Sequence, residues 1–411
     1  MHHLIGPFHE ILTMQNLPLK GPLSDDQLPV VRNGGVLIDQ DGYIREIGPY
    51  NHLRRDYPNA EMDLAEGDLV ALPGLIDSHT HLCWGGSRAR DYALRVSSVS
   101  YQEIAARGGG IHDTVTQTRK ATDETLLRST VTRADQLLDK GITTIEVKGG
   151  YGQSVAQELR LLRIIKEAAR KTKASIVPTA LPAHIVPSAF AERPKDYLDT
   201  LYTEFFPVVK AEGLTSRADI FVDEHAYNVA LSRAYAKKVR ALGFELTVHA
   251  DQFSTGGSEV AVEAGAVSAD HLEASTPADM KRLAQSDTVA TVLPGASLGL
   301  GIPFSPARKL LDTGCCLAIA SDWNPGSGPM GDLLTQAALL GAYEKLSHAE
   351  VLAGITVRAA RALRIEDRGS LVKHQLADIA AFSTSDYREI LYHQGQMQPA
   401  AVWKSGQRIT T

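Results

Sequence analysis

The amino-acid sequence predicts an α/β protein, a (β/α)8 barrel of the TIM type with a small β-sandwich beside it. The chain has 411 residues, which is too long for one small core but suits a barrel of roughly 250 residues or more with an accessory unit. From about residue 69, short β-branched runs alternate with longer stretches of helical period, a pattern typical of repeated βα units around a parallel sheet. Both chain ends instead contain short runs in which apolar and polar residues alternate, and turn residues separate these runs.

The number of β runs indicates a closed barrel. Each run is short and apolar, and most are followed by a segment of helical period, of which SVAQELRLLRIIKEAARK is the clearest. Eight such runs occur, and eight is the number of strands in a TIM-type barrel. The predicted strands are residues 69–81, 142–152, 175–184, 218–225, 244–252, 266–271, 288–295 and 316–325.

The two ends of the chain predict one further domain. Residues 30–50 have hairpin character, with turn signals at NGG and DG. Residues 378–390 and 399–409 look similar, and neither end alone has enough strands to bury a face. We therefore expect residues 1–68 and 366–411 to form the two parts of a β-sandwich and residues 69–365 to form the barrel.

The composition restricts the classes of partner. Hydrophobic residues make up 44% of the chain and charged residues 22%, and no apolar run approaches the roughly 20 residues that a membrane-spanning helix needs. The net charge is −6 with scattered Lys and Arg, so we expect a small-molecule partner and neither nucleic acid nor membrane. The start lacks a signal-peptide pattern, and the three cysteines lack CxxC spacing, which predicts a cytoplasmic protein with reduced thiols.

Polar residues gather where the predicted barrel strands end. Six of the 14 histidines lie at or just past the carboxyl end of a strand, and Asp322 ends the eighth strand. Barrel enzymes carry their active sites at that face. A single histidine there is more often a hydrogen-bonded buried residue, but several imidazoles and a carboxylate at one mouth predict a metal site. The six histidines are His79, His81, His184, His225, His249 and His271.

His79 and His81 are the first candidates for metal ligands. Side chains alternate between the two faces of a strand, so both imidazoles point into the barrel and present two nitrogens to one ion. This HxH pattern alone is weak, but it becomes specific together with His249, His271 and the Ser-Asp pair at residues 321–322. Neutral imidazoles and a carboxylate suit Zn²⁺ or Fe²⁺.

The motifs are similar to those of known metal-dependent hydrolases. The sequence resembles the amidohydrolase superfamily in four features: PGLIDSHTH, the strand-end histidines, the SD of the eighth strand and GSLVKHQLADIAAF. Within this superfamily, most of residues 70–365 resemble the imidazolonepropionase family. The motifs that carry this resemblance are HTHLCWGGSRARDYALR, SYQEIAARGGGI, KGGYG, HADQF and SDWNPGS. The resemblance implies a homodimer that opens the ring of 4-imidazolone-5-propanoate to N-formimidoyl-L-glutamate in histidine degradation. It implies attack of a metal-bound hydroxide on the ring carbonyl carbon.

The resemblance also implies the metal ligands and the catalytic groups. Binuclear superfamily members have a bridging lysine on strand four, whereas Lys148 lies on predicted strand two, so one zinc or iron ion is expected. His271 is implied as an acid/base that does not bind the metal, and Asp322 shares the base role. His184 is expected to bond the ring carbonyl or the developing oxyanion. The implied metal ligands are His79, His81, His249 and Asp322.

An imidazolone propanoate carries a carboxylate tail, which needs its own binding group. A guanidinium binds a carboxylate through two parallel hydrogen bonds, so Arg88 is predicted for the tail, with a solvated surface arginine as the alternative. Tyr151 and His184 are expected to offer hydrogen bonds to the substrate. Tyr101 is another candidate, although its ring could equally pack in the core. Gln252 is neutral, so it can bind the substrate but cannot act as a base. The last candidates lie in one turn, which could be purely structural: Asn324, Gly326 and Ser327.

Two other functions stay open from the sequence. A mononuclear amidohydrolase that deaminates a purine, a pyrimidine or a related ring would share the metal ligands, but its substrate gives Arg88 no carboxylate to bind. A barrel that binds a metal or a small ligand without catalysis predicts no turnover, and it leaves His271 without a role.

Overall fold

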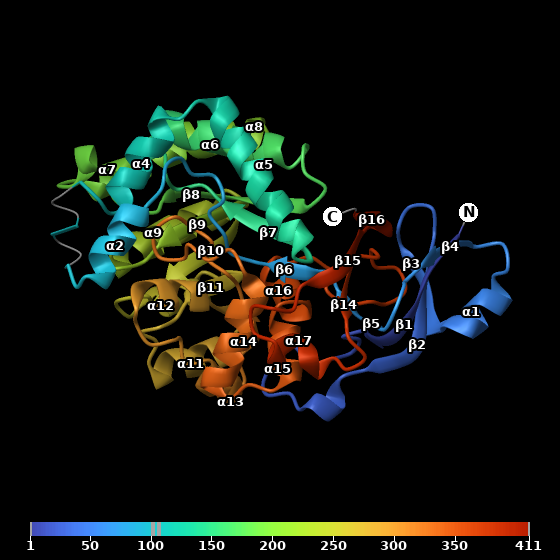
Figure 1. Cartoon of the computed structure of the whole chain (residues 1–411). Helices are drawn as coiled ribbons and strands as arrows, with labels where there is room; N and C mark the ends of the chain where they lie inside the picture. The colour runs from blue at the N-terminus through green and yellow to red at the C-terminus, as the bar shows by residue number, and fades with distance from the viewer. Residues whose placement is uncertain (1, 100–102, 105–107, 410–411) are drawn as a thin grey trace.

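The computed structural model describes residues 2–99, 103–104 and 108–409. Within these ranges the chain forms two eight-stranded sheets. One sheet is parallel and surrounded by helices, and the other lies beside it, next to both chain termini (Figure 1). The predicted fold class, a barrel with one small β domain built from both chain ends, is confirmed.

The barrel strands follow one another around the sheet in chain order. Each strand pairs in parallel with the next. The circle closes after the last strand, because the backbone N–H of Asp322 donates to the carbonyl of His79 and that of His81 donates to the carbonyl of Trp323, both at 3.0 Å. The strands are β6 (Leu75–Asp77), β7 (Ile142–Lys148), β8 (Ser175–Ala183), β9 (Arg217–Phe221), β10 (Glu245–Ala250), β11 (Ser268–His271), β12 (Val289–Val292) and β13 (Leu317–Ile319).

Helices with one apolar face cover the outside of the barrel (Figure 1). The predicted helix after the second strand is α6 (Val155–Ala168), which begins at Ser154, whose hydroxyl accepts a hydrogen bond from the N–H of Gln157. Its Leu and Ile side chains recur every three to four residues and are buried. The other helices are α2 (Ala89–Val96), α4 (Ile111–Lys120), α5 (Asp123–Asp139), α7 (Pro194–Thr200), α8 (Phe206–Ala211), α9 (Val229–Ala241), α10 (Gly257–Glu263), α11 (Pro277–Ala284), α12 (Pro294–Leu300), α13 (Ala307–Thr313), α14 (Leu333–Glu344), α15 (His348–Gly354) and α16 (Val357–Ala362).

The small domain joins strands from both ends of the chain into one mixed sheet. Its order is β16-β15-β14-β5-β1-β2-β3, with β4 also paired to β1. Phe8 and Trp403 meet edge to face in its core, with ring centroids 5.8 Å apart. The strands are β1 (His3–Leu12), β2 (Val30–Ile38), β3 (Ile44–Pro49), β4 (Glu61–Leu64), β5 (Leu69–Pro73), β14 (Ile379–Ser383), β15 (Pro399–Lys404) and β16 (Gln407–Ile409), and the helices are α1 (Tyr50–Asp56) and α17 (Arg388–Tyr392).

Three local predictions were wrong. Residues 69–81 do not form one barrel strand: β5 pairs with β1 and β14 in the small sheet, and only β6 belongs to the barrel. The break falls at Gly74, where a β-carbon would lie 2.3 Å from the Thr143 hydroxyl, so only glycine allows the chain to pass from one sheet to the other. NGG does not turn, because β2 runs through it and Gly34 packs against Ile11. Residues 388–390 begin helix α17 rather than extend a strand.

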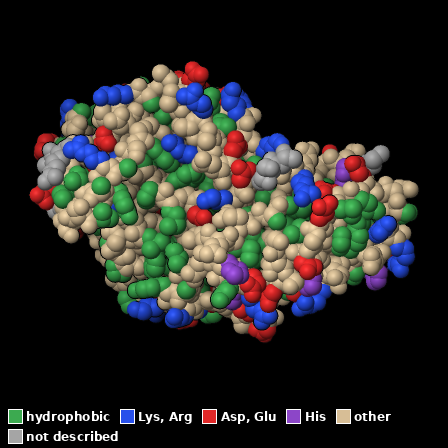
Figure 2. Space-filling model, in the orientation of Figure 1, with side chains coloured by type: hydrophobic (Ala, Val, Ile, Leu, Met, Phe, Trp, Pro, Cys, Tyr) green, Lys and Arg blue, Asp and Glu red, His purple; other side chains and the backbone are tan. Residues whose placement is uncertain are grey.

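The predicted domain limits, 1–68, 69–365 and 366–411, stay a prediction. No helix in the described part of the chain is both long and apolar enough to cross a membrane. On the face shown in Figure 2, acidic and basic side chains are interspersed, as the scattered Lys and Arg of the sequence predicted.

Candidate active site

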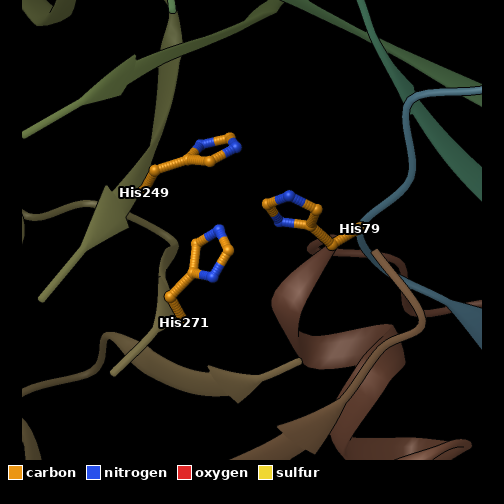
Figure 3. Close-up of side chains that lie close together, drawn as sticks. All are labelled: His79, His249 and His271. Atoms are coloured by element: carbon orange, nitrogen blue, oxygen red, sulfur yellow. The ribbon is translucent and has the colours of Figure 1, made fainter. Parts of the chain in front are cut away.

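Four buried histidines and one partly buried histidine, His184, meet inside the carboxyl end of the barrel. His79 and His81 follow β6, His184 follows β8, and His249 and His271 lie at the ends of β10 and β11. The ring centroids of His79 and His249 are 4.6 Å apart, and those of His249 and His271 are 5.3 Å apart. Figure 3 shows His79, His249 and His271 pointing toward one another. The sixth predicted histidine, His225, lies exposed in the turn after β9.

The four predicted metal ligands lie in one group. Asp322 Oδ1 is 3.5 Å from His81 Nε2 and 3.7 Å from His79 Nε2. His249 Nε2 is also 3.5 Å from His81 Nε2. His79, His81 and Asp322 could hold one ion, as could His79, His249 and His271, because in each trio the possible ligand atoms lie within 4.8 Å of one another. The structure therefore brings the predicted ligands together and places His271 beside them.

The chemistry of this group fits a cation. His79 Nε2 is buried and has no hydrogen-bond partner among the described residues, although an unsatisfied buried polar atom costs about 1–3 kcal/mol. Burial lowers the pKa of His79 and of His81 well below the usual range, so both rings are neutral, the form that binds a metal. Burial also lowers the pKa of His249, against the pull of the Asp219 carboxylate.

His271 differs from the other four histidines. Burial alone would lower its pKa, but the carboxylates of Glu273, whose Oε2 lies 3.7 Å from Nδ1, Asp322 and Asp270 together outweigh burial and raise the pKa. His271 has a φ of +90°, a strained value for a residue with a side chain. The hydroxyl of Ser305 donates to its carbonyl at 2.5 Å and holds this conformation. A histidine that gains a proton more easily than its neighbours suits proton transfer.

Asp322 begins a tight turn that orients its carboxylate. Burial raises the pKa of Asp322, and the Ser327 hydroxyl donates to its Oδ2 at 3.3 Å. The Asn324 side chain accepts from the N–H of Gly326 at 2.8 Å and of Ser327 at 2.9 Å, and donates to the Asp322 carbonyl at 2.7 Å. The Asn324 side chain thus holds the turn together, and its contact with a substrate stays a prediction.

Arg88 lies beside this turn, at the start of α2. Its Nε donates to Asp91 and its Nη1 donates to Thr114 Oγ1 at 3.2 Å. A β-carbon on Gly326 would lie 3.4 Å from Arg88 Nη1, so the guanidinium lies against residues 324–327. Only 9% of the Arg88 side chain is exposed, which differs from a solvated surface arginine.

Tyr151 and His184 lie next to His81. The His184 and His81 rings stack with centroids 5.2 Å apart, and the Tyr151 ring lies 5.7 Å from the His184 ring. Burial lowers the pKa of His184 to about 3 and raises that of Tyr151, so both are neutral hydrogen-bonding groups. Gln252 is buried just after β10. Tyr101 lies outside the described residues.

The loop that carries Tyr151 is held by a carboxylate that the sequence did not reveal. Glu158 of α6 accepts hydrogen bonds from the N–H groups of Gly150, Gly152 and Gln153, at 2.9, 2.6 and 2.9 Å. Burial raises the pKa of Glu158 to about 7 in spite of these three donors.

A second unpredicted group lies directly under the histidines. Lys148 contacts the buried side chains of Glu146 and Asp219 and lies close to Asp270. Burial lowers the pKa of Lys148, but attraction to the three carboxylates outweighs it and raises the pKa. Two signals were available in the sequence. Glu146 and Lys148 are two residues apart in β7, so their side chains face the same side of the strand, and Asp270 directly precedes His271.

Sequence comparison finds similar proteins over nearly the whole chain. The model of the amidohydrolase family matches residues 70–409. An imidazolonepropionase of Symbiobacterium thermophilum is 41% identical over 410 residues, which cover 97% of this chain and 95% of that protein.

Solved structures with less sequence similarity have the same fold. An atrazine chlorohydrolase from Arthrobacter aurescens TC1, complexed with zinc, has a TM-score of 0.69 at 18% identity over 99% of this chain and 95% of its own. An adenosine deaminase from Xanthomonas campestris with bound zinc has a TM-score of 0.70 at 18% identity over 98% of this chain and 92% of its own. At this identity the likeness concerns the fold alone.

Proposed function

This chain belongs to the imidazolonepropionase family of the amidohydrolases, and we propose that it hydrolyses 4-imidazolone-5-propanoate to N-formimidoyl-L-glutamate. The reaction breaks the bond between the ring carbonyl carbon and the adjacent ring nitrogen. The OH of a water molecule goes to the carbon and a proton goes to the nitrogen. The observation that carries the proposal is the buried group of neutral imidazoles around one carboxylate, with an arginine nearby that can bind an acidic tail.

We assign one divalent ion, zinc or iron, to His79, His81, His249 and Asp322. When bound, such an ion lowers the pKa of a water molecule from about 15.7 toward 7 and polarises a carbonyl. Burial keeps the imidazoles of His79 and His81 neutral, so these ligands need not lose a proton first.

His271 and Asp322 are the proton carriers in this proposal. Either can take a proton as water adds to the ring carbonyl carbon, and His271, with its raised pKa, is suited to returning it to the leaving nitrogen. Glu273 stabilises the protonated His271 ring. His184, a neutral imidazole stacked on His81, can donate a hydrogen bond to the developing oxyanion.

The remaining predicted residues bind and orient the substrate. Arg88 pairs with the propanoate carboxylate through its guanidinium, which Asp91 and Thr114 hold against the turn. Tyr151 offers its hydroxyl to the ring. We assign further contacts to Tyr101, Gln252, Asn324, Gly326 and Ser327. We also expect a homodimer from the family resemblance, and a cytoplasmic location from the buried, unpaired cysteines.

A related deaminase is the second candidate, because the fold is shared with an adenosine deaminase. A neutral nucleobase would offer no carboxylate to the Arg88 guanidinium, which is mostly buried and already held by Asp91, so this arginine favours the acidic substrate.

The test is the ultraviolet decay of freshly prepared 4-imidazolone-5-propanoate with purified protein of known metal content, corrected for spontaneous decay. The proposal predicts a decay rate proportional to the concentration of metal-loaded protein. Protein that holds one metal ion per chain and leaves the decay rate unchanged would refute the imidazolonepropionase assignment, and ammonia release from nucleobases would then support the deaminase.

A further inference from the structure

A buried lysine lies under the histidines, and the roles proposed above do not use it. Lys148 ends β7 and its side chain is 0% exposed. Its Nζ donates to Glu146 Oε1 at 2.8 Å and to Asp219 Oδ2 at 2.7 Å, and it lies 3.6 Å from Asp270 Oδ2. One ammonium therefore lies among three carboxylates that are themselves buried.

Two of these carboxylates each contact one of the assigned metal ligands. Asp270 Oδ2 lies 2.7 Å from His79 Nδ1, and Asp219 Oδ1 lies 3.1 Å from His249 Nδ1. A carboxylate accepts hydrogen bonds, so each ring carries its proton on Nδ1 and leaves Nε2 to bind a cation. Such contacts fix both the tautomer and the orientation of a metal-binding histidine.

The barrel geometry explains why one lysine reaches both carboxylates. Lys148, Asp219 and Asp270 come from β7, β9 and β11, which are alternate strands of the sheet. Inward-facing side chains of alternate strands lie in the same layer of a barrel. The three residues therefore form one polar layer, directly below the layer that contains the histidines.

We propose that Lys148 is a positioning residue for the metal site: it holds Asp219 and Asp270 in place and thereby orients His249 and His79 together. The inference rests on the metal site of the proposed function. Balancing the charge of a buried ammonium requires one carboxylate, whereas Lys148 has three carboxylates around it. The second contacts of Asp219 and Asp270 end on imidazoles, which links the lysine to two ligands at once.

The test is the dissociation constant of Zn²⁺, measured by competition with a chromophoric chelator, in the full-length protein and its variants. Lys148→Met removes the ammonium but keeps an unbranched side chain, and we expect zinc binding to weaken by about 10–100-fold. Lys148→Gln keeps an N–H donor without the charge, so we expect a smaller loss. This variant carries the test if Lys148→Met does not fold.

Lys404→Met is the matched control. Lys404 is a lysine of the small sheet with only 10% of its side chain exposed, and its Nζ pairs with Asp378 Oδ2 at 2.6 Å. We expect this variant to bind zinc as tightly as the wild-type protein. Combining Lys148→Met with Asp270→Asn should weaken binding by less than the product of the two single effects, because both act through His79.

The outcomes separate the two proposals. Wild-type zinc affinity in a folded Lys148→Met or Lys148→Gln variant would overturn the positioning role, as would equal weakening in Lys404→Met. A wild-type protein that binds no zinc and no iron would instead refute the metal site of the proposed function, and the role of Lys148 would be lost with it.

Discussion

The two eight-stranded sheets bury charged side chains in different ways. In the small sheet, Lys404 pairs with Asp378 at 2.6 Å, and Arg368 lies 4.0 Å from the same carboxylate. Arg368 also donates to Asp367 and to the hydroxyls of Thr144 in β7 and Ser175 in β8, so the charges of this network are satisfied by its own members. In the barrel, the carboxylates that bind Lys148 continue to His79 and His249, and His79 Nε2 stays without a partner among the described residues.

The difference indicates that the charged residues of the small sheet stabilise the fold, whereas those of the barrel position the proposed metal ligands. A network that satisfies its own members needs no further ligand, whereas a buried network that ends on an unpaired nitrogen indicates a missing partner. Changes in the barrel network should therefore reduce metal binding and turnover, and changes in the small sheet should reduce stability. Each prediction below tests or refines that division.

The largest effect is expected for Asp322→Asn. The amide keeps the volume of the side chain but removes the ligand charge and the base, so kcat should fall roughly 10³-fold or more. Because burial already raises the pKa of Asp322, the free energy of unfolding should change little. Steady-state kinetics and urea unfolding check both parts, and a tenfold or smaller loss of kcat with full metal content would contradict the assignment.

Lys404→Met should show the opposite behaviour. Removing one partner of a buried ion pair leaves the Asp378 carboxylate uncompensated, and we expect the free energy of unfolding to fall by about 3 kcal/mol. The kcat of the folded variant should stay within about twofold of wild type, because a small-sheet pair does not contact the site. A large loss of kcat with an unchanged free energy of unfolding would contradict the difference between the two sheets.

Arg88→Met tests the substrate's acidic tail. Loss of a charge-assisted hydrogen bond to a carboxylate should raise KM about 10–100-fold, with a smaller effect on kcat. The exposed neighbour Arg90 offers a matched control, since Arg90→Met should leave KM unchanged. Equal KM values for Arg88→Met and wild type would place the tail elsewhere.

A separate effect is expected on the pH dependence of stability, through Glu158. Burial raises the pKa of Glu158 to about 7, so between pH 4.5 and 7 the folded protein holds this proton more tightly than the unfolded chain. The contribution of Glu158 to the free energy of unfolding is therefore present at low pH and is lost as pH rises through 7. Glu158→Gln cannot titrate, so its unfolding free energy should gain about 3 kcal/mol relative to wild type between pH 4.5 and 7.5. Urea unfolding at several pH values measures this, and a constant difference would contradict the raised pKa.

Local patterns predicted much of the fold and the histidine site. The alternation of β and helical runs gave the correct strand count, and the period of two placed His79 and His81 on one side. The prediction failed where long-range packing decides: β5 joins the small sheet because β1 and β14 pair with it from opposite ends of the chain.

The polar layer below the histidines was harder to predict for the same reason. Lys148 and Asp219 are 71 residues apart, and their contact exists only once alternate strands share a layer. The sequence shows the charged residues in β7 but not their partners. Glu158 is similar, because an ordinary helix residue becomes a loop anchor only when Gly150 and Gly152 turn their N–H groups toward it.

The most direct test of the central claim is the product formed from 4-imidazolone-5-propanoate in H₂¹⁸O by the metal-loaded protein. Hydrolysis of the ring carbonyl predicts N-formimidoyl-glutamate with one ¹⁸O in the new carboxylate, detected by mass spectrometry as a mass increase of about 2 Da, and no release of ammonia. The Asp322→Asn variant should form this product no faster than the spontaneous reaction. Unlabelled product, or no product above the spontaneous rate from fully loaded wild-type protein, would contradict the account.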